Sequence, residues 1–144
     1  MERTYDTLGE SAKLAAVQPC AALDPPWEFE ILSRTRVRRR WGHGSDSTLW
    51  RLEADGLLVP RRYGGRLGYT WRDLWDYEGG QPPDGMDAAY REDLVGPEAI
   101  AALCPLSAAA ILARAKRGEI PSRRIGRFVK FVPEEARRWL RQWR

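Results

Sequence analysis

The chain has little of what builds metal centres and disulfide frameworks, because its 144 residues include only 2 cysteines and 1 histidine. Cys20 and Cys104 form no C-x-x-C pair, so the sequence supports neither a structural zinc site nor a disulfide-stapled fold. No nucleophile, base and orienting group come together in a recognisable pattern, and no glycine-rich phosphate loop follows a predicted strand. We therefore expect no enzymatic activity, no metal, no cofactor and no small-molecule ligand.

Long apolar runs are also absent. No run approaches the roughly 18 residues that a membrane helix needs, and the start at Met1 lacks the apolar segment of a secretory signal. These absences predict a cytoplasmic protein with no membrane partner. A composition of 43% apolar residues with 7 tryptophans indicates a folded chain.

The charge is distributed in blocks, although the net charge is only +4. Residues 29–78 hold 10 basic and 7 acidic residues, and residues 94–144 hold 11 basic and 4 acidic residues. The segments 1–28 and 79–93 are acidic and contain proline and glycine. This layout predicts an N-terminal segment over 1–28, a module at 29–78, a linker at 79–93 and a second module at 94–144. Within the N-terminal segment, Leu8–Val17 is expected to form one short helix.

The two basic blocks are copies of one another. Ser45–Tyr77 aligns with Ser107–Trp139 without a gap, and the alignment keeps both the glycines and the apolar positions in step. The aligned identities in this stretch are Ser45/Ser107, Gly56/Gly118, Arg61/Arg123, Arg62/Arg124 and Gly64/Gly126. We interpret the blocks as two copies of one fold.

Each copy predicts two short helices, a hairpin and a closing helix. In the second copy, Pro97 suits a first helical position, Ser107 caps the next helix, and Gly118 ends it. A four-residue turn between such helices is typical of a helix-turn-helix. In the first copy the gapless alignment would bury arginines in the opening helix, so a one-residue slip that buries Val37 and Trp41 is physically better.

The ordered strings P-E-A-I-A-A-L-C-P-L-S (Pro97–Ser107), R-R-I-G-R (Arg123–Arg127) and P-E-E-A-R-R-W-L (Pro133–Leu140) resemble the winged helix-turn-helix of phage and plasmid excisionases and of MerR-type regulators. The first copy matches through S-T-L-W-R-L-E-A-D-G-L-L and R-R-Y-G-G-R. Pro105 replaces the usual turn glycine. The resemblance implies a mainly α fold with small β-hairpin wings, in two tandem winged helix-turn-helix modules. It also implies a second helix in the major groove and a wing on the minor groove or backbone.

DNA binding needs cations for the phosphates and a slim helix for the base edges. In the second copy, Ile111 and Ala115 mark the buried side of the second helix, so its alanines turn outward and favour recognition by DNA shape. The candidate DNA-binding residues of this copy are Ser107, Ala109, Ala110, Ala113, Arg114, Lys116, Arg117, Arg123, Arg124, Arg127 and Lys130.

The first copy is expected to bind DNA less well. Its second helix carries Asp46, Glu53 and Asp55 against Arg51 alone, which would repel phosphates. Arginines elsewhere in the copy are expected to compensate. The candidates here are Arg34, Arg36, Arg38, Arg39, Arg40, Ser47, Thr48, Arg51, Arg61, Arg62 and Arg66.

These residues favour sequence- and shape-dependent binding of double-stranded DNA by a non-enzymatic, nucleoid-associated protein. The first hypothesis is an excisionase-like architectural factor that sets recombination direction beside an integrase or recombinase. A transcription regulator of a phage or mobile-element operon, which would meet RNA polymerase, is an alternative. In a third hypothesis the acidic first copy binds a protein, and only the second copy holds DNA.

Overall fold

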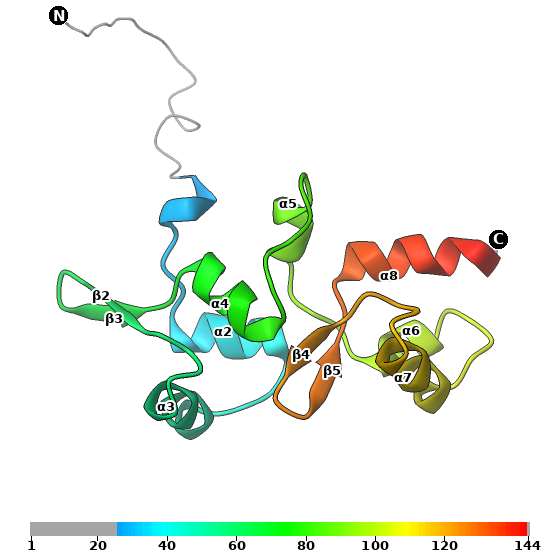
Figure 1. Cartoon of the computed structure of the whole chain (residues 1–144), viewed down its shortest axis with the longest axis horizontal. Helices are drawn as coiled ribbons and strands as arrows, with labels where there is room; N and C mark the ends of the chain where they lie inside the picture. The colour runs from blue at the N-terminus through cyan, green and yellow to red at the C-terminus, as the bar shows by residue number, and fades with distance from the viewer. Residues whose placement is uncertain (1–25, 144) are drawn as a thin grey trace, which may run out of the picture. The chain divides into compact units, whose positions relative to one another are not determined.

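A serine or threonine N-cap, or a proline in the first turn, begins each longer helix of the computed structural model, which describes residues 26–143 (Figure 1). The helix expected at Leu8–Val17 lies outside these residues. The chain divides into two units. The first ends at Glu30 and contains the 3-10 turn η1 (Trp27–Phe29), and the second begins at Ile31 and holds both copies of the repeat.

The first copy has the expected order of elements. They are α2 (Arg34–Trp41), α3 (Asp46–Ala54), β2 (Arg61–Tyr63), β3 (Arg66–Gly68) and α4 (Trp71–Glu78). α2 ends at Gly42, whose φ of 77° is in the left-handed region that favours glycine. Ser45 then caps α3 by accepting a hydrogen bond from the Thr48 amide. These two signals fix the turn between the helices.

The second copy repeats that order after a short connecting helix, α5 (Asp87–Tyr90). Its elements are α6 (Pro97–Ala101), α7 (Ala108–Lys116), β4 (Arg123–Ile125), β5 (Phe128–Lys130), α8 (Pro133–Leu140) and the 3-10 turn η2 (Arg141–Trp143). Each hairpin is a separate two-stranded antiparallel sheet. The part of the chain from 26 to 143 is therefore mainly helical with two small hairpins, which confirms the coarse fold prediction.

The internal repeat is matched element by element. When the copies are aligned, the bounds agree for four pairs of elements: α3 with α7, β2 with β4, β3 with β5, and α4 with α8. The opening helices differ, because α6 begins one position later in the alignment than α2. Val37 and Ile100, which this shift brings into register, are both fully buried. The predicted one-residue slip in the opening helix is confirmed. Each hairpin is also prolonged by one isolated bridge at matching positions, Leu32 with Tyr69 and Val95 with Phe131.

A buried ion-pair cluster joins the two copies. Arg40 at the end of α2 donates to both carboxylate oxygens of Glu78 at the end of α4, over 2.8 and 2.9 Å. Arg123 of β4, in the other copy, donates to the same carboxylate over 3.4 Å and to the carbonyl oxygens of Trp75 and Gly80. All three charged side chains are buried. The β4–β5 hairpin therefore packs on the first copy (Figure 1).

The segment 79–93 is not the open, flexible connector that its composition predicts. Met86 and Tyr90 are buried, and the Tyr90 hydroxyl donates to Glu135 of α8 over 2.7 Å. The Trp75 indole N–H, in turn, donates to the Tyr90 carbonyl oxygen. The composition missed these anchors because two apolar side chains among glycines and prolines give no periodic signal. With the segment held at Tyr90, the two copies form one compact unit.

Candidate nucleic-acid interface

The second helix of the second copy presents the predicted alanine face. Ala109 and Ala113 are exposed, Ala110 is half-buried, and Ile111 and Ala115 are buried. The Ser107 hydroxyl accepts from the Ala110 amide as the helix cap. A small, uncharged surface of this kind allows close approach to a duplex and offers few hydrogen bonds to base edges.

The cations at the end of α7 are partly neutralised. Arg117 and Arg114 both pair with Glu119, at 2.7 and 3.3 Å, and the hydrogen bond from Arg117 is the main reason that the pKa of Glu119 lies below its usual value. Lys116 is exposed and pairs with no acidic group among the described residues. Exposed ion pairs are weak because water screens them, so a phosphate can displace Glu119 at low cost.

The arginines of α2 are less available than the sequence predicts. Arg36 and Arg39 pair with Asp93, Arg38 with Asp46, and Arg34 with Glu53. Arg40 is fully buried against Glu78, and its guanidinium lies over the Trp71 ring. The prediction of Arg40 as a DNA contact is therefore wrong. Its cation stabilises the joint between the copies.

The two hairpins carry equivalent arginines in different environments. In the first, Arg61 is exposed and pairs with Asp73 at 2.7 Å. The hydrogen bond from Arg61 lowers the pKa of the Asp73 carboxyl. Arg123, at the same repeat position, is buried against Glu78 and also lies over the Tyr90 ring. The prediction of Arg123 as a phosphate contact is wrong for the same physical reason as that of Arg40: a duplex cannot reach a cation enclosed by protein.

The predicted cations that remain unpaired are exposed or half-buried and lie on α3, α7 and the hairpins. Among residues 26–143 these side chains have no hydrogen bond or ion pair to a protein group: Arg51, Arg62, Arg66, Lys116, Arg124, Arg127 and Lys130. In Figure 1, α3, the β4–β5 turn and α7 lie along the lower edge of the second unit, and α8 lies along the upper edge. Six exposed or half-buried residues of α3, α7 and the β4–β5 hairpin are together called the basic edge: Thr48, Arg51, Ala109, Ala113, Arg124 and Arg127.

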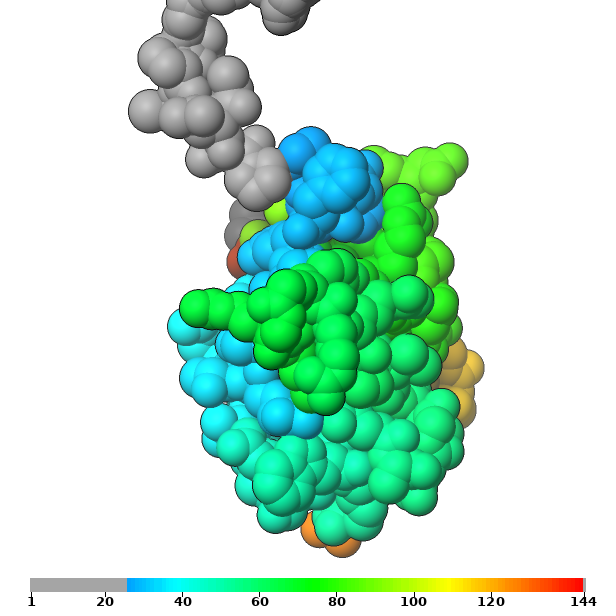
Figure 2. All heavy atoms as spheres, turned by 90° about the vertical axis from the view of Figure 1, so that its left-hand side faces the viewer, coloured from blue at the N-terminus to red at the C-terminus, as the bar shows by residue number. Residues whose placement is uncertain are grey.

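The exposed side of α3 differs from that of α7. Ser47 and Arg51 are exposed as predicted, and Thr48 is half-buried. Trp50 is 59% exposed, and Leu57 and Val59 in the following loop are 57% and 51% exposed. Figure 2 views the unit from the side on which α3 and the β2–β3 hairpin lie. This end of the first copy combines large apolar side chains with the acidic residues of α3.

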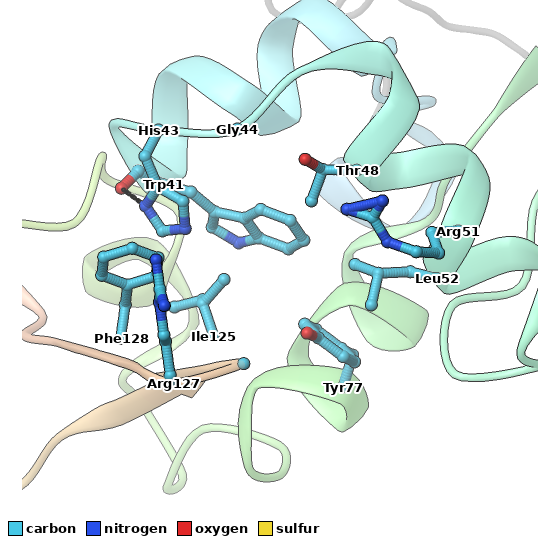
Figure 3. A pocket seen from close by; sticks show the side chains of 11 residues that line it. Trp41, His43, Gly44, Thr48, Arg51, Leu52, Tyr77, Ile125, Arg127 and Phe128 are labelled. Atoms are coloured by element: carbon cyan, nitrogen blue, oxygen red, sulfur yellow. Dashed lines mark hydrogen bonds between the residues drawn. The ribbon is translucent and has the colours of Figure 1, made fainter.

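A pocket opens on the basic edge where the second copy's hairpin meets the first copy (Figure 3). It has a volume of about 440 Å³. Thr48, Arg51 and Leu52 line it from α3, and residues of the β4–β5 turn line the other side. Trp41 and Tyr77 also line it, and the Trp41 indole lies in the middle of the view. The sequence does not predict this pocket, because its walls come from positions far apart in the chain that only the packing of the hairpin brings together.

His43 lies at the edge of this pocket and is half-buried, not the exposed turn residue that its glycine neighbours favour. Its ring lies 4.2 Å from the Phe128 ring, centroid to centroid, and its Nδ1 atom bonds with the Trp41 carbonyl oxygen. Burial, and then the positive charge of Lys130, lower the pKa of the imidazole below its usual 6.5. The folded protein therefore holds His43 neutral at neutral pH.

Acidification toward pH 5.5 is expected to destabilise the fold through His43. The unfolded chain takes up this proton near pH 6.5, whereas the folded chain resists it, so the stabilisation is complete above pH 6.5 and is lost as the pH falls below it. Urea unfolding measures the free energy of unfolding at about pH 7.5 and at about pH 5.5. The difference between these two values should be smaller for His43→Gln than for the unaltered protein. The pKa values of the Asp73 and Glu119 carboxyls are lowered by their arginine partners, so these two groups titrate below this window. An equal change in both proteins would contradict this role for His43.

No described helix is long and apolar enough to span a bilayer, and residues 26–143 hold no group of three side chains suited to a metal ion. Comparison of the chain with families of known proteins, with curated proteins and with solved structures finds no match.

Proposed function

We propose that this chain binds double-stranded DNA through two tandem winged helix-turn-helix units of the excisionase and MerR type. In each unit the second helix, α3 or α7, faces the major groove, and the β2–β3 or β4–β5 hairpin is the wing. One observation carries the proposal: the predicted cations left without an acidic partner among the described residues are confined to the second helices and the hairpins. Cations placed in this way are what phosphate binding requires.

The joint between the copies supports binding by one rigid body. Arg40, Glu78 and Arg123 fix the second hairpin against the first copy, so the two second helices are held in one spacing. A duplex that contacts both must adapt to that spacing, which is the property of an architectural factor that bends DNA. We therefore place the excisionase-like role, beside an integrase or recombinase, ahead of the transcription regulator.

An excision assay separates these two roles. The purified chain is added to the integrase and attachment sites from its own gene neighbourhood, and excision is compared with and without it. Stimulation supports the architectural role. No stimulation, together with repression or activation of the neighbouring promoter, would move the function to transcription and leave DNA binding intact.

The exposed apolar side chains of the first copy favour one part of the third hypothesis, a protein partner on this copy, but not its other part, that only the second copy holds DNA. Trp50 sits beside Arg51 on α3, with Leu57 and Val59 nearby, and tryptophan is enriched at interface hot spots. Trp50→Ser is expected to leave duplex affinity unchanged within about twofold, while reducing excision in the same assay. A large loss of duplex affinity in this variant would instead place Trp50 in the DNA interface.

A further inference from the structure

The pocket between the copies has cationic and polar groups on its rim but no acidic group. Of its lining residues, Arg51 and Arg127 carry the charge, and neither forms an ion pair among the residues that the structure describes. In Figure 3 the Arg51 side chain extends from α3 toward the Trp41 indole on one side of the pocket, and the Arg127 side chain extends from the β4–β5 turn beside Phe128 on the other. The Thr48 side chain lies near Arg51 in the same view. Two unpaired guanidinium groups facing one hollow favour an anion.

The walls of the pocket are apolar and aromatic. Phe128 is 41% exposed, and the Arg127 guanidinium lies 5.3 Å from its ring centroid. Trp41 and Tyr77, with ring centroids 5.6 Å apart, and Leu52 form the remaining surface. An inorganic anion would leave this surface uncovered, and an uncharged aromatic molecule would leave both guanidinium groups without a partner. The volume of about 440 Å³ lies within the range of small-ligand sites.

We propose that this pocket binds one nucleotide unit. The phosphate binds at the cationic rim to which Arg51 and Arg127 belong, and the sugar or base lies against Leu52, Tyr77 and Phe128. The nucleotide belongs either to a strand of bound DNA or to a free mononucleotide. The first case rests on the proposed DNA binding, and the second does not.

The test uses the intact chain with thymidine monophosphate, thymidine and inorganic phosphate as probes, and follows the resonances of Phe128 and of the Arg51 and Arg127 side chains by NMR. The variants are Arg51→Gln and Arg127→Gln. Arg66→Gln is the matched control, because Arg66 is also exposed and unpaired among the described residues but does not line the pocket. For a free nucleotide, thymidine monophosphate binds more tightly than either fragment, each pocket variant weakens it at least about tenfold, and the control does not.

A duplex arm distinguishes the two sources. If the nucleotide belongs to DNA, the free probes bind weakly or not at all, and both pocket variants weaken duplex binding more than the control does. Because both arginines then contact the same nucleotide, the duplex affinity of the Arg51→Gln/Arg127→Gln double variant falls by clearly less than the product of the two single losses. The fold loss of duplex affinity in the Arg51→Gln/Arg66→Gln double variant is expected to equal the product of the two single losses.

Failure of the pocket and failure of DNA binding give different results. The pocket proposal would be overturned, with DNA binding intact, by two results together. The Arg51 and Arg127 variants would lose duplex affinity independently and by no more than the Arg66 control, and thymidine monophosphate would not bind. Binding of thymidine monophosphate without duplex binding would support the pocket and reject the proposed function. No binding of any probe or duplex would overturn both.

Discussion

Replacing Glu78 with glutamine is expected to cost about 3–5 kcal/mol of unfolding free energy. The Glu78 carboxylate accepts hydrogen bonds from Arg40, Arg123 and the Trp41 indole N–H, the last over 2.7 Å, and all of these groups are buried. Without its charge, two guanidinium groups remain in the interior with no counter-ion. Because small domains have about 5–15 kcal/mol of stability, this loss would bring the protein close to unfolding.

Urea unfolding followed by tryptophan fluorescence measures this cost. The matched control is Asp73→Asn, which removes the carboxylate from Arg61 at the equivalent hairpin position, where the arginine is exposed and the aspartate is half-buried. We expect the control to lose less than about 1 kcal/mol. A Glu78→Gln variant that is no less stable than the control would show that the buried cluster does not hold the copies together.

Neutralising Arg51, Arg124 and Arg127 together is expected to weaken binding to all duplex sequences by about 10²–10³-fold near 0.1 M salt. These cations of the basic edge have no acidic partner to release among the described residues, so each is free to displace a counter-ion from a phosphate. The slope of log K against log salt concentration should become less negative by about 0.9 for each phosphate that is no longer neutralised. The total change is about 1.8 where Arg51 and Arg127 contact one phosphate, as in the pocket proposed above, and about 2.7 where they contact two.

A control with the same change in net charge separates direct phosphate binding from general attraction. Arg137, Arg138 and Arg141 are exposed, pair with Glu134, and belong to or follow α8 at the edge opposite the basic edge (Figure 1). Replacing these three with glutamine is expected to change the slope by less than one unit. Equal slopes for the two triple variants would remove the basic edge from the interface.

The local elements were predictable because their signals are local. Ser45 and Ser107 cap α3 and α7, and Gly56 and Gly118, which follow these helices, adopt the expected positive φ. The apolar positions Ile111 and Ala115 of α7 are buried as predicted. The duplication supported these predictions further, because the same capping serine and terminal glycine occur in both copies. Even the slip at Val37 could be derived from the cost of burying arginine.

The joint between the copies was not predictable from the same signals. Arg61 and Arg123 are identical in the alignment, and nothing near either one indicates that Arg123 meets a carboxylate far away in the chain while Arg61 stays on the surface. Burial of a charge depends on which partner the whole fold supplies. The same packing created the pocket at Arg51 and Arg127, so the sequence could supply the cations but not their arrangement.

The salt dependence of duplex binding by the intact chain tests the central claim most directly. A fluorescent duplex from the protein's own gene neighbourhood is titrated at several salt concentrations, from about 50 mM to about 200 mM. The account predicts binding at low salt and a steep, linear fall of log K with log salt concentration that the basic-edge triple variant flattens. Absence of duplex binding at about 50 mM salt by a folded protein would contradict it.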